Sequence, residues 1–174
     1  MFKRRQLPPD LVNIINWRDP SDIQSVVDYL TKPISAACDL HILGIRLQML
    51  LELMLYLNKI GLFSFDIDTG KNPTVLTQSH IHIFKKQLDK TDEFIRQQLV
   101  NDYLTAVNTS LERQLQLKLV PPKPSAFSLV SYFTDVEPPL IENPIKLINL
   151  LMTSKAQMQA HLDVLRPRRN AVNP

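Results

Sequence analysis

The sequence predicts a mostly α-helical fold: an irregular bundle of four to five helices around one buried central helix, with one short extended segment and a proline-rich C-terminal extension. Only 3 of the 174 residues are glycine, whereas 13 are proline, so tight turns are scarce and the connections are stiff. Residues 40–57 are apolar nearly all round, as expected of a central helix. Elsewhere, apolar residues recur at the spacing of one helix face.

The first elements have clear start and stop signals. Residues 1–18 form a basic N-terminal segment in which residues 8–17 predict a short helix. Asp19 followed by Pro20 is typical of an N-cap and first helical position, so residues 19–119 are expected to form the helical core. Pro33 is expected to end the first core helix and to open the central one, residues 33–59, which Gly61 caps.

The central helix carries a few polar residues that define its faces. A helical wheel places one group of them within about 40° of arc, which predicts a narrow solvent-exposed stripe; this stripe comprises His41, Gln48, Glu52 and Lys59. Asp39 and Arg46 point the opposite way and are expected to make a polar contact across the core. Because residues 40–57 contain several polar and charged side chains, we expect them to form a buried helix and not a membrane span. Gly44, in mid-helix, predicts that another backbone packs close to it.

Residues 62–68 and 79–118 complete the expected core. Residues 62–68 alternate apolar and polar side chains and predict an extended segment that covers helices or is lent to a partner. Residues 79–118 contain no proline or glycine and predict one long helix, with a break near residues 101–102 or two halves that pack on different surfaces. Two possibilities stay open. Either the segment forms two core helices with a kink between them, or its first half packs on the bundle and its second half binds a partner protein. The partner-facing candidates are Leu104, Val107, Leu111 and Leu115.

The C-terminal third divides into three segments. Residues 120–143 are proline-rich and predict an extended docking segment, because proline lowers the entropy cost of binding. Its candidate anchors are Phe127, Tyr132, Phe133, Leu140 and Ile141. The alternative is that these side chains pack back on the chain's own helices. Asn143 and Pro144 predict the start of a last helix over residues 144–165, and residues 166–174 form a basic tail.

Catalytic and metal-binding patterns are incomplete. Asp66 and Asp68 point to one side of a strand and are the best candidates for Mg²⁺, but a phosphate-binding loop and a third carboxylate are missing. His80 and His82 have no completing ligands nearby, and the single cysteine, Cys38, excludes a thiolate zinc site and an intramolecular disulfide. We therefore expect no enzyme activity, no cofactor, no bound metal and no small-molecule substrate.

Positive charge is concentrated at the two ends of the chain. Six of the 20 lysines and arginines lie there, and the other 14 accompany 17 acidic residues, which leaves the body at −3. The six are Lys3, Arg4, Arg5, Arg166, Arg168 and Arg169. Such short clusters are candidates for weak, non-specific contact with nucleic acid or for a nuclear localisation signal.

These patterns favour a non-enzymatic helical adaptor or scaffold subunit of a multiprotein assembly, nuclear and associated with nucleic acid, for example in a chromatin or chromosome-end complex. Its expected partners are one or more protein subunits and not a membrane. One alternative is a protein that binds nucleic acid directly, such as a chromatin factor or a viral RNA-binding protein. The other is a divergent metal-dependent nucleotidyl-transfer enzyme that uses Asp66 and Asp68. A cytoplasmic location is the alternative to the nucleus, and the single cysteine favours a reducing compartment over secretion.

Overall fold

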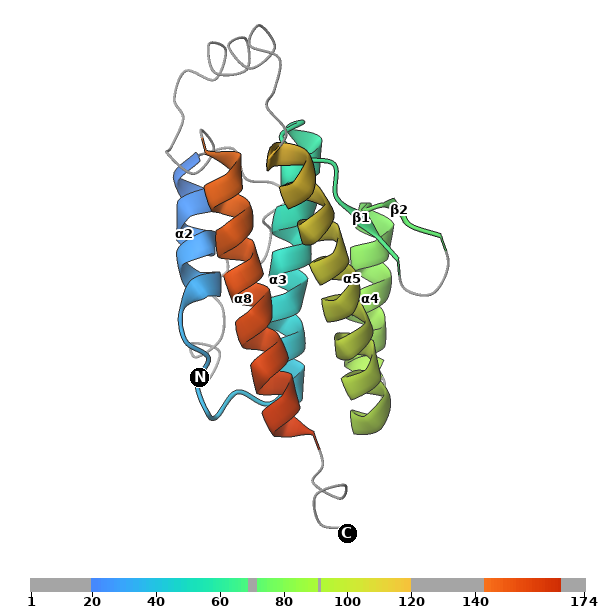
Figure 1. Ribbon diagram of the computed structural model, residues 1–174. Helices are drawn as coiled ribbons and strands as arrows, with labels where there is room; N and C mark the ends of the chain where they lie inside the picture. The colour runs from blue at the N-terminus through green and yellow to red at the C-terminus, as the bar shows by residue number, and fades with distance from the viewer. Residues whose placement is uncertain (1–19, 69–71, 91, 120–142, 167–174) are drawn as a thin grey trace, which may run out of the picture.

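The computed structural model of the chain describes residues 20–68, 72–90, 92–119 and 143–166 (Figure 1). These residues form five helices: α2 (Pro20–Thr31), α3 (Leu40–Lys59), α4 (Gln78–Lys90), α5 (Glu93–Leu119) and α8 (Pro144–Leu165). Strands β1 (Asp66–Ile67) and β2 (Thr74–Val75) pair antiparallel as a small hairpin. The predicted helical bundle is thereby confirmed.

Helix α3 is the centre of the bundle. It packs against each of the other four helices, which follow one another around it in the order α2, α8, α5, α4. Helices that are consecutive along the described chain run in alternating directions (Figure 1). Six of the leucines on α3 are completely buried, namely Leu43, Leu47, Leu50, Leu51, Leu53 and Leu57. The sequence-based assignment of a buried central helix is correct. Within the described residues α3 is also the one helix long and apolar enough to cross a membrane by length and composition, and its burial among four helices is that of a core helix.

The central helix begins later than its sequence predicts. It starts at Leu40, and the Asp39 side chain accepts a hydrogen bond of 2.8 Å from the backbone N–H of Ile42, which is a normal N-cap. Pro33 therefore lies in the connection between α2 and α3. The other end of the helix is as expected: Gly61 has φ +80° and its N–H bonds to the carbonyl of Asn58. Leu62 N–H bonds back to the Leu57 carbonyl, which completes a Schellman cap.

The predicted solvent-exposed stripe on α3 is wrong in its middle, whereas Lys59 is exposed and His41 is partly exposed. Gln48 and Glu52 are only 8% exposed, and Gln48 Nε2 donates a 2.9 Å hydrogen bond to Glu52 Oε2. Helix α4 packs along this side of α3, where His41 Nε2 donates to Asp89 of α4 at 3.1 Å. The polar pair is tolerated because one side chain hydrogen-bonds the other. A wheel for one helix cannot reveal that a second helix lies over its polar side.

Two helices stand where one long helix was the default expectation. Helix α4 ends at Lys90 and α5 begins at Glu93, about ten residues before the expected break near residues 101–102. Asp92 Oδ1 accepts a 3.0 Å hydrogen bond from the backbone N–H of Ile95, and so caps the start of α5. Arg96 Nε donates to the Leu88 carbonyl at 2.9 Å and ties the end of α4 to the start of α5. The two helices therefore form an antiparallel hairpin.

The segment at residues 62–68 is extended, as predicted, and covers helices. Phe63, Phe65 and Ile67 are buried, and the rings of Phe63 and Phe65 stack at 5.0 Å. Helix α5 holds the backbone of this segment: Ser110 Oγ accepts from the N–H of residue 66, and Gln114 Nε2 donates to the carbonyl of residue 64. The pairing of β1 with β2 was not expected from the sequence.

Candidate functional site

The second apolar face of α5 belongs to the chain's own core. Leu104, Val107 and Leu111 are completely buried, and Leu115 is partly buried against the same cluster. Helix α8 packs along α5 and covers this face together with α3. These four residues were candidates for a partner interface; in the structure the chain's own helices cover three of them completely and Leu115 in part. Of the two possibilities that the sequence left open, the structure has two core helices.

Most of the other predicted contact residues lie outside the described residues. This applies to the five anchors of the docking segment and to the basic residues 3–5, 168 and 169. Arg166 is described, and it belongs to the bundle: it ends α8, and its Nη2 donates a 2.8 Å hydrogen bond to Asn101 Oδ1 of α5. Gln97 Nε2 also donates to the Leu165 carbonyl. Arg166 thus links the end of α8 to α5. The sequence analysis had placed this residue in the basic tail.

The paired aspartates are part of the fold. Asp66 accepts from Nη1 of Arg113 on α5 with both carboxylate oxygens, and this ion pair holds the hairpin to the bundle. Asp68 is exposed at the end of the strand. Across the described ranges no group of three or more His, Cys, Asp or Glu side chains is placed to hold a metal ion. The alternative of a metal-dependent enzyme therefore gains no third carboxylate from this part of the chain.

His80 joins β2 to α4. The backbone N–H of Thr77 donates a 3.0 Å hydrogen bond to His80 Nδ1, so the third helical residue reaches back to the N-cap residue. The other ring nitrogen, Nε2, lies 3.1 Å from the hydroxyl of Thr74 and donates to it, because Nδ1 is an acceptor. His82 is exposed on the same helix. Both ring nitrogens of His80 are therefore engaged in hydrogen bonds at the start of α4.

Arg46 is the most buried cation in the described structure. Its Nη2 donates to the carbonyls of Tyr29, Leu30 and Lys32, at 3.1, 2.7 and 2.6 Å, and so caps the end of α2. The guanidinium also lies over the Tyr29 ring, 5.1 Å from its centroid. Burial lowers the pKa of Arg46. The contact expected between Asp39 and Arg46 is absent, since each of the two caps a different helix end.

Cys38 has no nucleophilic environment. The thiol is buried, and desolvation, followed by the neighbouring Asp39 carboxylate, raises the pKa of Cys38. His161 Nε2 donates a 2.8 Å hydrogen bond to the carbonyl of residue 38 and not to the sulfur. A thiol with a raised pKa is mostly protonated at neutral pH and reacts slowly. His161 therefore links α8 to the connection that precedes α3 by a hydrogen bond.

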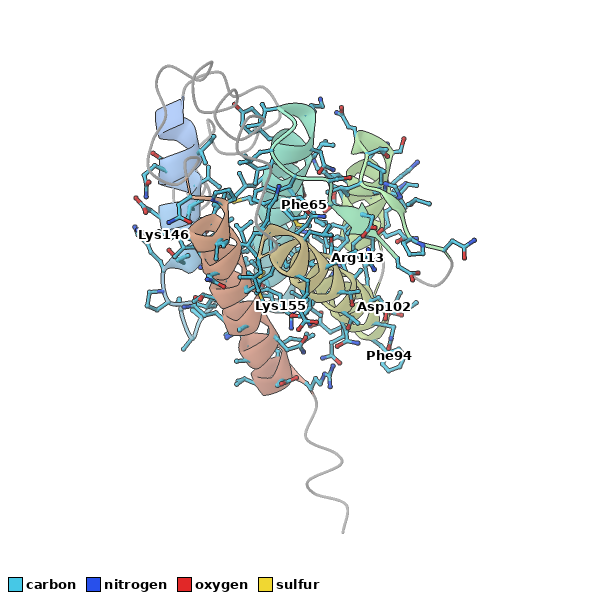
Figure 2. The ribbon with its side chains drawn as sticks, turned by 45° about the horizontal axis from the view of Figure 1, so that its top comes forward. Phe65, Phe94, Asp102, Arg113, Lys146 and Lys155 are labelled. Atoms are coloured by element: carbon cyan, nitrogen blue, oxygen red, sulfur yellow. The ribbon has the colours of Figure 1, made fainter. Side chains whose placement is uncertain are left out.

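Sequence reasoning missed three large apolar side chains that are exposed on α4 and in the first turn of α5. Ile83 is 50% exposed, Ile95 49% and Phe94 66%. Figure 2 shows Phe94 at the start of α5, directed away from the bundle. Lys86 and Lys90 are exposed on α4 in helical register with Ile83, and neither makes an ion pair with any described residue. The sequence contains one sign of the helix break beside these residues, namely Asp92, which is a typical N-cap residue.

The connection between α5 and α8 is far longer than its geometry requires. Helix α5 ends and helix α8 begins at the same end of the bundle, and the two helices pack directly on each other (Figure 1). Antiparallel neighbours of this kind are commonly joined by about 2–8 residues. Here α5 ends at Leu119 and α8 begins at Pro144. Connections longer than about 12–15 residues that contain no secondary structure of their own are usually functional segments or linkers.

Comparison with protein-family models, with curated proteins and with solved structures found no significant match for this chain.

Proposed function

We propose that this protein is a non-enzymatic helical adaptor, a subunit that holds other proteins together through the segment between α5 and α8. The observation that carries the proposal is the length of that connection between two helices that already pack on each other. The bundle supplies a rigid body, and the proline-bounded sequence between its helices supplies five large apolar side chains. Binding through such a segment costs little entropy because proline restricts the free chain.

A second line of support is the use that the fold makes of its polar residues. Asp39, Asp92 and Asn143 cap helix starts, and Arg46 caps a helix end. The Asp66–Arg113 pair fixes the β-hairpin. Side chains that carry chemistry in enzymes are here engaged in holding the described bundle together. This pattern favours a structural role over a catalytic one.

The nuclear and nucleic-acid-associated part of the proposal rests on the basic ends alone. Lys3, Arg4 and Arg5 precede the bundle, and Arg168 and Arg169 follow it. Five such cations reach phosphate groups without base-specific contacts, so any contact is weak and falls steeply with salt. In the adaptor role they add non-specific affinity to an assembly that already lies close to nucleic acid.

The test is affinity purification of tagged full-length protein from its native cells, compared with the variant Phe127→Ala with Phe133→Ala. Subunits recovered in stoichiometric amount with the unchanged chain should be lost from the variant, because interface aromatics commonly contribute about 2 kcal/mol or more each. The matched control, Ser125→Ala with Ser128→Ala, changes the same segment without its anchors and should retain the subunits. Recovery of no stoichiometric subunit from the unchanged chain would end the adaptor proposal.

A further inference from the structure

The four helices around α3 form a row that does not close into a ring. Consecutive members of the row pack on each other, namely α2 with α8, α8 with α5 and α5 with α4. Among the described residues no comparable packing joins α4 back to α2. One side of the central helix is therefore left between the two ends of the row.

The helical wheel of α3 identifies this side. In Figure 1 α3 runs upward, with α4 on its right, α2 on its left, and α5 and α8 in front of it. Gly44 lies against α4, and Arg46 donates to the last carbonyls of α2. About 200° separates residues 44 and 46 on a right-handed helix, and this arc passes behind α3. Side chains within the arc point away from α5 and α8.

Four apolar residues lie inside this arc, within about 60° of one another. We call Ile42, Ile45, Met49 and Tyr56 the rear face of α3. Met49 is only 2% exposed, Ile45 and Tyr56 are partly buried against the core, and Ile42 is 48% exposed. From residue 42 to residue 56 the rear face is about 21 Å long at 1.5 Å per residue. Because a helix that is apolar all round is stable only when every side is covered, the rear face requires a covering element of similar length.

The start of α2 lies beside the upper end of the rear face. Arg46 holds the carbonyl of Leu30 near the end of α2, and α2 begins ten residues earlier, at Pro20. The start of α2 is therefore about 15 Å further along α3, near the level of Tyr56. Residue 17 precedes Pro20 by three residues, which reach about 10 Å. This is about the distance between the axes of two packed helices.

Residues 8–17 have the length and the pattern that the rear face requires. As a helix they are about 15 Å long, and Leu11, Ile14 and Ile15 recur at the spacing of one helix face. The proline-bounded connection between α5 and α8 is a poorer match, because both of its ends leave helices that lie on the opposite side of α3 (Figure 1).

We propose that residues 8–17 form a helix that packs on the rear face, antiparallel to α2, and that this docking brings the two basic ends of the chain together as one site for a nucleic-acid backbone. A helix that starts near the level of Tyr56 and covers the rear face runs back toward the beginning of α3. Lys3, Arg4 and Arg5 are three to five residues beyond it, so they reach the end of the bundle at which α3 begins.

Helix α8 ends at this same end of the bundle. His161 donates to the carbonyl of Cys38, just before α3, and Arg168 and Arg169 follow within four residues of the last residue of α8. The five cations then lie at one end, and the connection between α5 and α8 lies at the other (Figure 1). This inference rests on the nucleic-acid-associated part of the proposed function and assigns it a place on the molecule.

Trp17 is the single tryptophan and reports docking in the full-length chain without any substitution. We expect blue-shifted emission and slow quenching by acrylamide. Leu11→Asp with Ile14→Asp should expose Trp17 and raise the quenching rate to that of the unfolded chain. Asn13→Asp with Asn16→Asp is the matched control, because it adds the same charges to the opposite side of the helix and should leave the emission unchanged. Emission and quenching in the unchanged chain equal to those of the unfolded chain would overturn the docking.

A disulfide cross-link tests the same contact without added charge. In full-length protein with Cys38→Ser, the pair Leu11→Cys with Met49→Cys should form a disulfide under mild oxidation. The control pair is Leu11→Cys with Thr109→Cys, since Thr109 is exposed on α5, on the far side of α3. Absence of the first cross-link, or equal yields of the two, would contradict the docking even if the aspartate variant failed to fold.

The joint basic site is tested with a fluorescein-labelled DNA duplex of 10 base pairs and random sequence. Fluorescence anisotropy at several salt concentrations should give a log–log slope of magnitude about 4 to 5 for the unchanged chain, as five phosphate contacts do. Leu11→Asp with Ile14→Asp should raise Kd by about tenfold or more, because the two clusters lose their effective concentration at one site, whereas the asparagine control should not. A slope of about 3 or less in the unchanged chain, or equal Kd values for the two variants, would overturn the joint site.

Purification from native cells separates this inference from the adaptor function. Subunits bound through the connection between α5 and α8 should be recovered equally with the Leu11→Asp, Ile14→Asp variant and with the unchanged chain. If the subunits are recovered but the DNA measurements fail as stated, the joint basic site is wrong and the adaptor function stands. If the unchanged chain recovers no subunit, the adaptor function fails, and the Trp17 and cross-linking results still decide the docking.

Discussion

Gly44 of α3 lies so close to Leu88 of α4 that a Cβ atom at residue 44 would stand 2.7 Å from Leu88 Cδ2. Leu88 is itself completely buried in the core cluster. This contact explains a glycine in the middle of a helix, where alanine is ordinarily preferred by about 1 kcal/mol. The close packing that Gly44 predicts is present, although the neighbour is a side chain and not a second backbone.

Gly44→Ala should lower the free energy of unfolding by about 1–3 kcal/mol, because the added methyl group overpacks the contact with Leu88. Urea denaturation measures the change. In a double-mutant cycle, Leu88→Ala should relieve the clash, so the two substitutions together should cost less than their sum. Gly61→Ala is the control: its cost comes from a backbone φ of +80° with open space around it, and Leu88→Ala should leave that cost unchanged. A Gly44→Ala protein as stable as the unchanged chain would contradict the packing of α3 on α4.

Leu104→Ala and Leu50→Ala should each cost roughly 2–5 kcal/mol of unfolding free energy, as truncations of fully buried leucines do. Leu117→Ala, at a residue 58% exposed on the same helix as Leu104, should change it by no more than about 0.5 kcal/mol. Thermal and chemical denaturation check both. If Leu104→Ala melted like the unchanged chain and instead weakened a complex, the second face of α5 would belong to a partner after all.

Arg46→Ala should destabilise the protein by about 3 kcal/mol, because it removes the charged donor that satisfies three carbonyls at the end of α2. Hydrogen exchange should be accelerated more in α2 than in α5, since α2 loses its cap. Arg113→Ala removes an arginine from a partly exposed ion pair, and there the cost should stay within about 1 kcal/mol. Equal effects of the two substitutions would contradict the role assigned to Arg46.

Stability should decrease at alkaline pH. Burial raises the pKa of Cys38, of Tyr29 and of Tyr103 above their ordinary values. In the unfolded chain these groups lose their protons first, so their stabilising effect is complete below about pH 9 and is lost as the pH rises further. Denaturation at about pH 8 and about pH 10.5 measures the loss, which Cys38→Ala should reduce. In the native protein at neutral pH, a thiol reagent should react with Cys38 far more slowly than with the unfolded chain; equal rates would show that the thiol is accessible.

Local signals predicted much of this fold because their physical cause is local. Asn143 caps α8 by accepting a hydrogen bond from the backbone of residue 146, and Gly61 ends α3 with a positive φ. Both outcomes depend on residues within one turn. The all-round apolar character of residues 40–57 likewise predicted the central helix, since such a helix is stable only when it is covered on every side.

The errors arose where a tertiary neighbour decides the outcome. The sequence of α3 alone predicts that Gln48 and Glu52 are exposed, but α4 packs over them. The sequence of α5 alone leaves Leu104 free to bind a partner, but α8 covers it. The break between Lys90 and Glu93 has a different cause: it contains neither proline nor glycine, and Asp92 marks it only as an ordinary N-cap.

The most direct test of the adaptor function is to shorten the connection between α5 and α8. Residues 121–141 are replaced by a glycine–serine linker of about 8 residues, a length that antiparallel packed helices accommodate. We expect a melting temperature within a few degrees of the unchanged chain, because α5 and α8 pack on each other without the segment, together with loss of the subunits that co-purify with the full-length protein. A shortened protein that retained its subunits in full, or that no longer folded, would contradict the account, since the segment would then be dispensable for binding or part of the core.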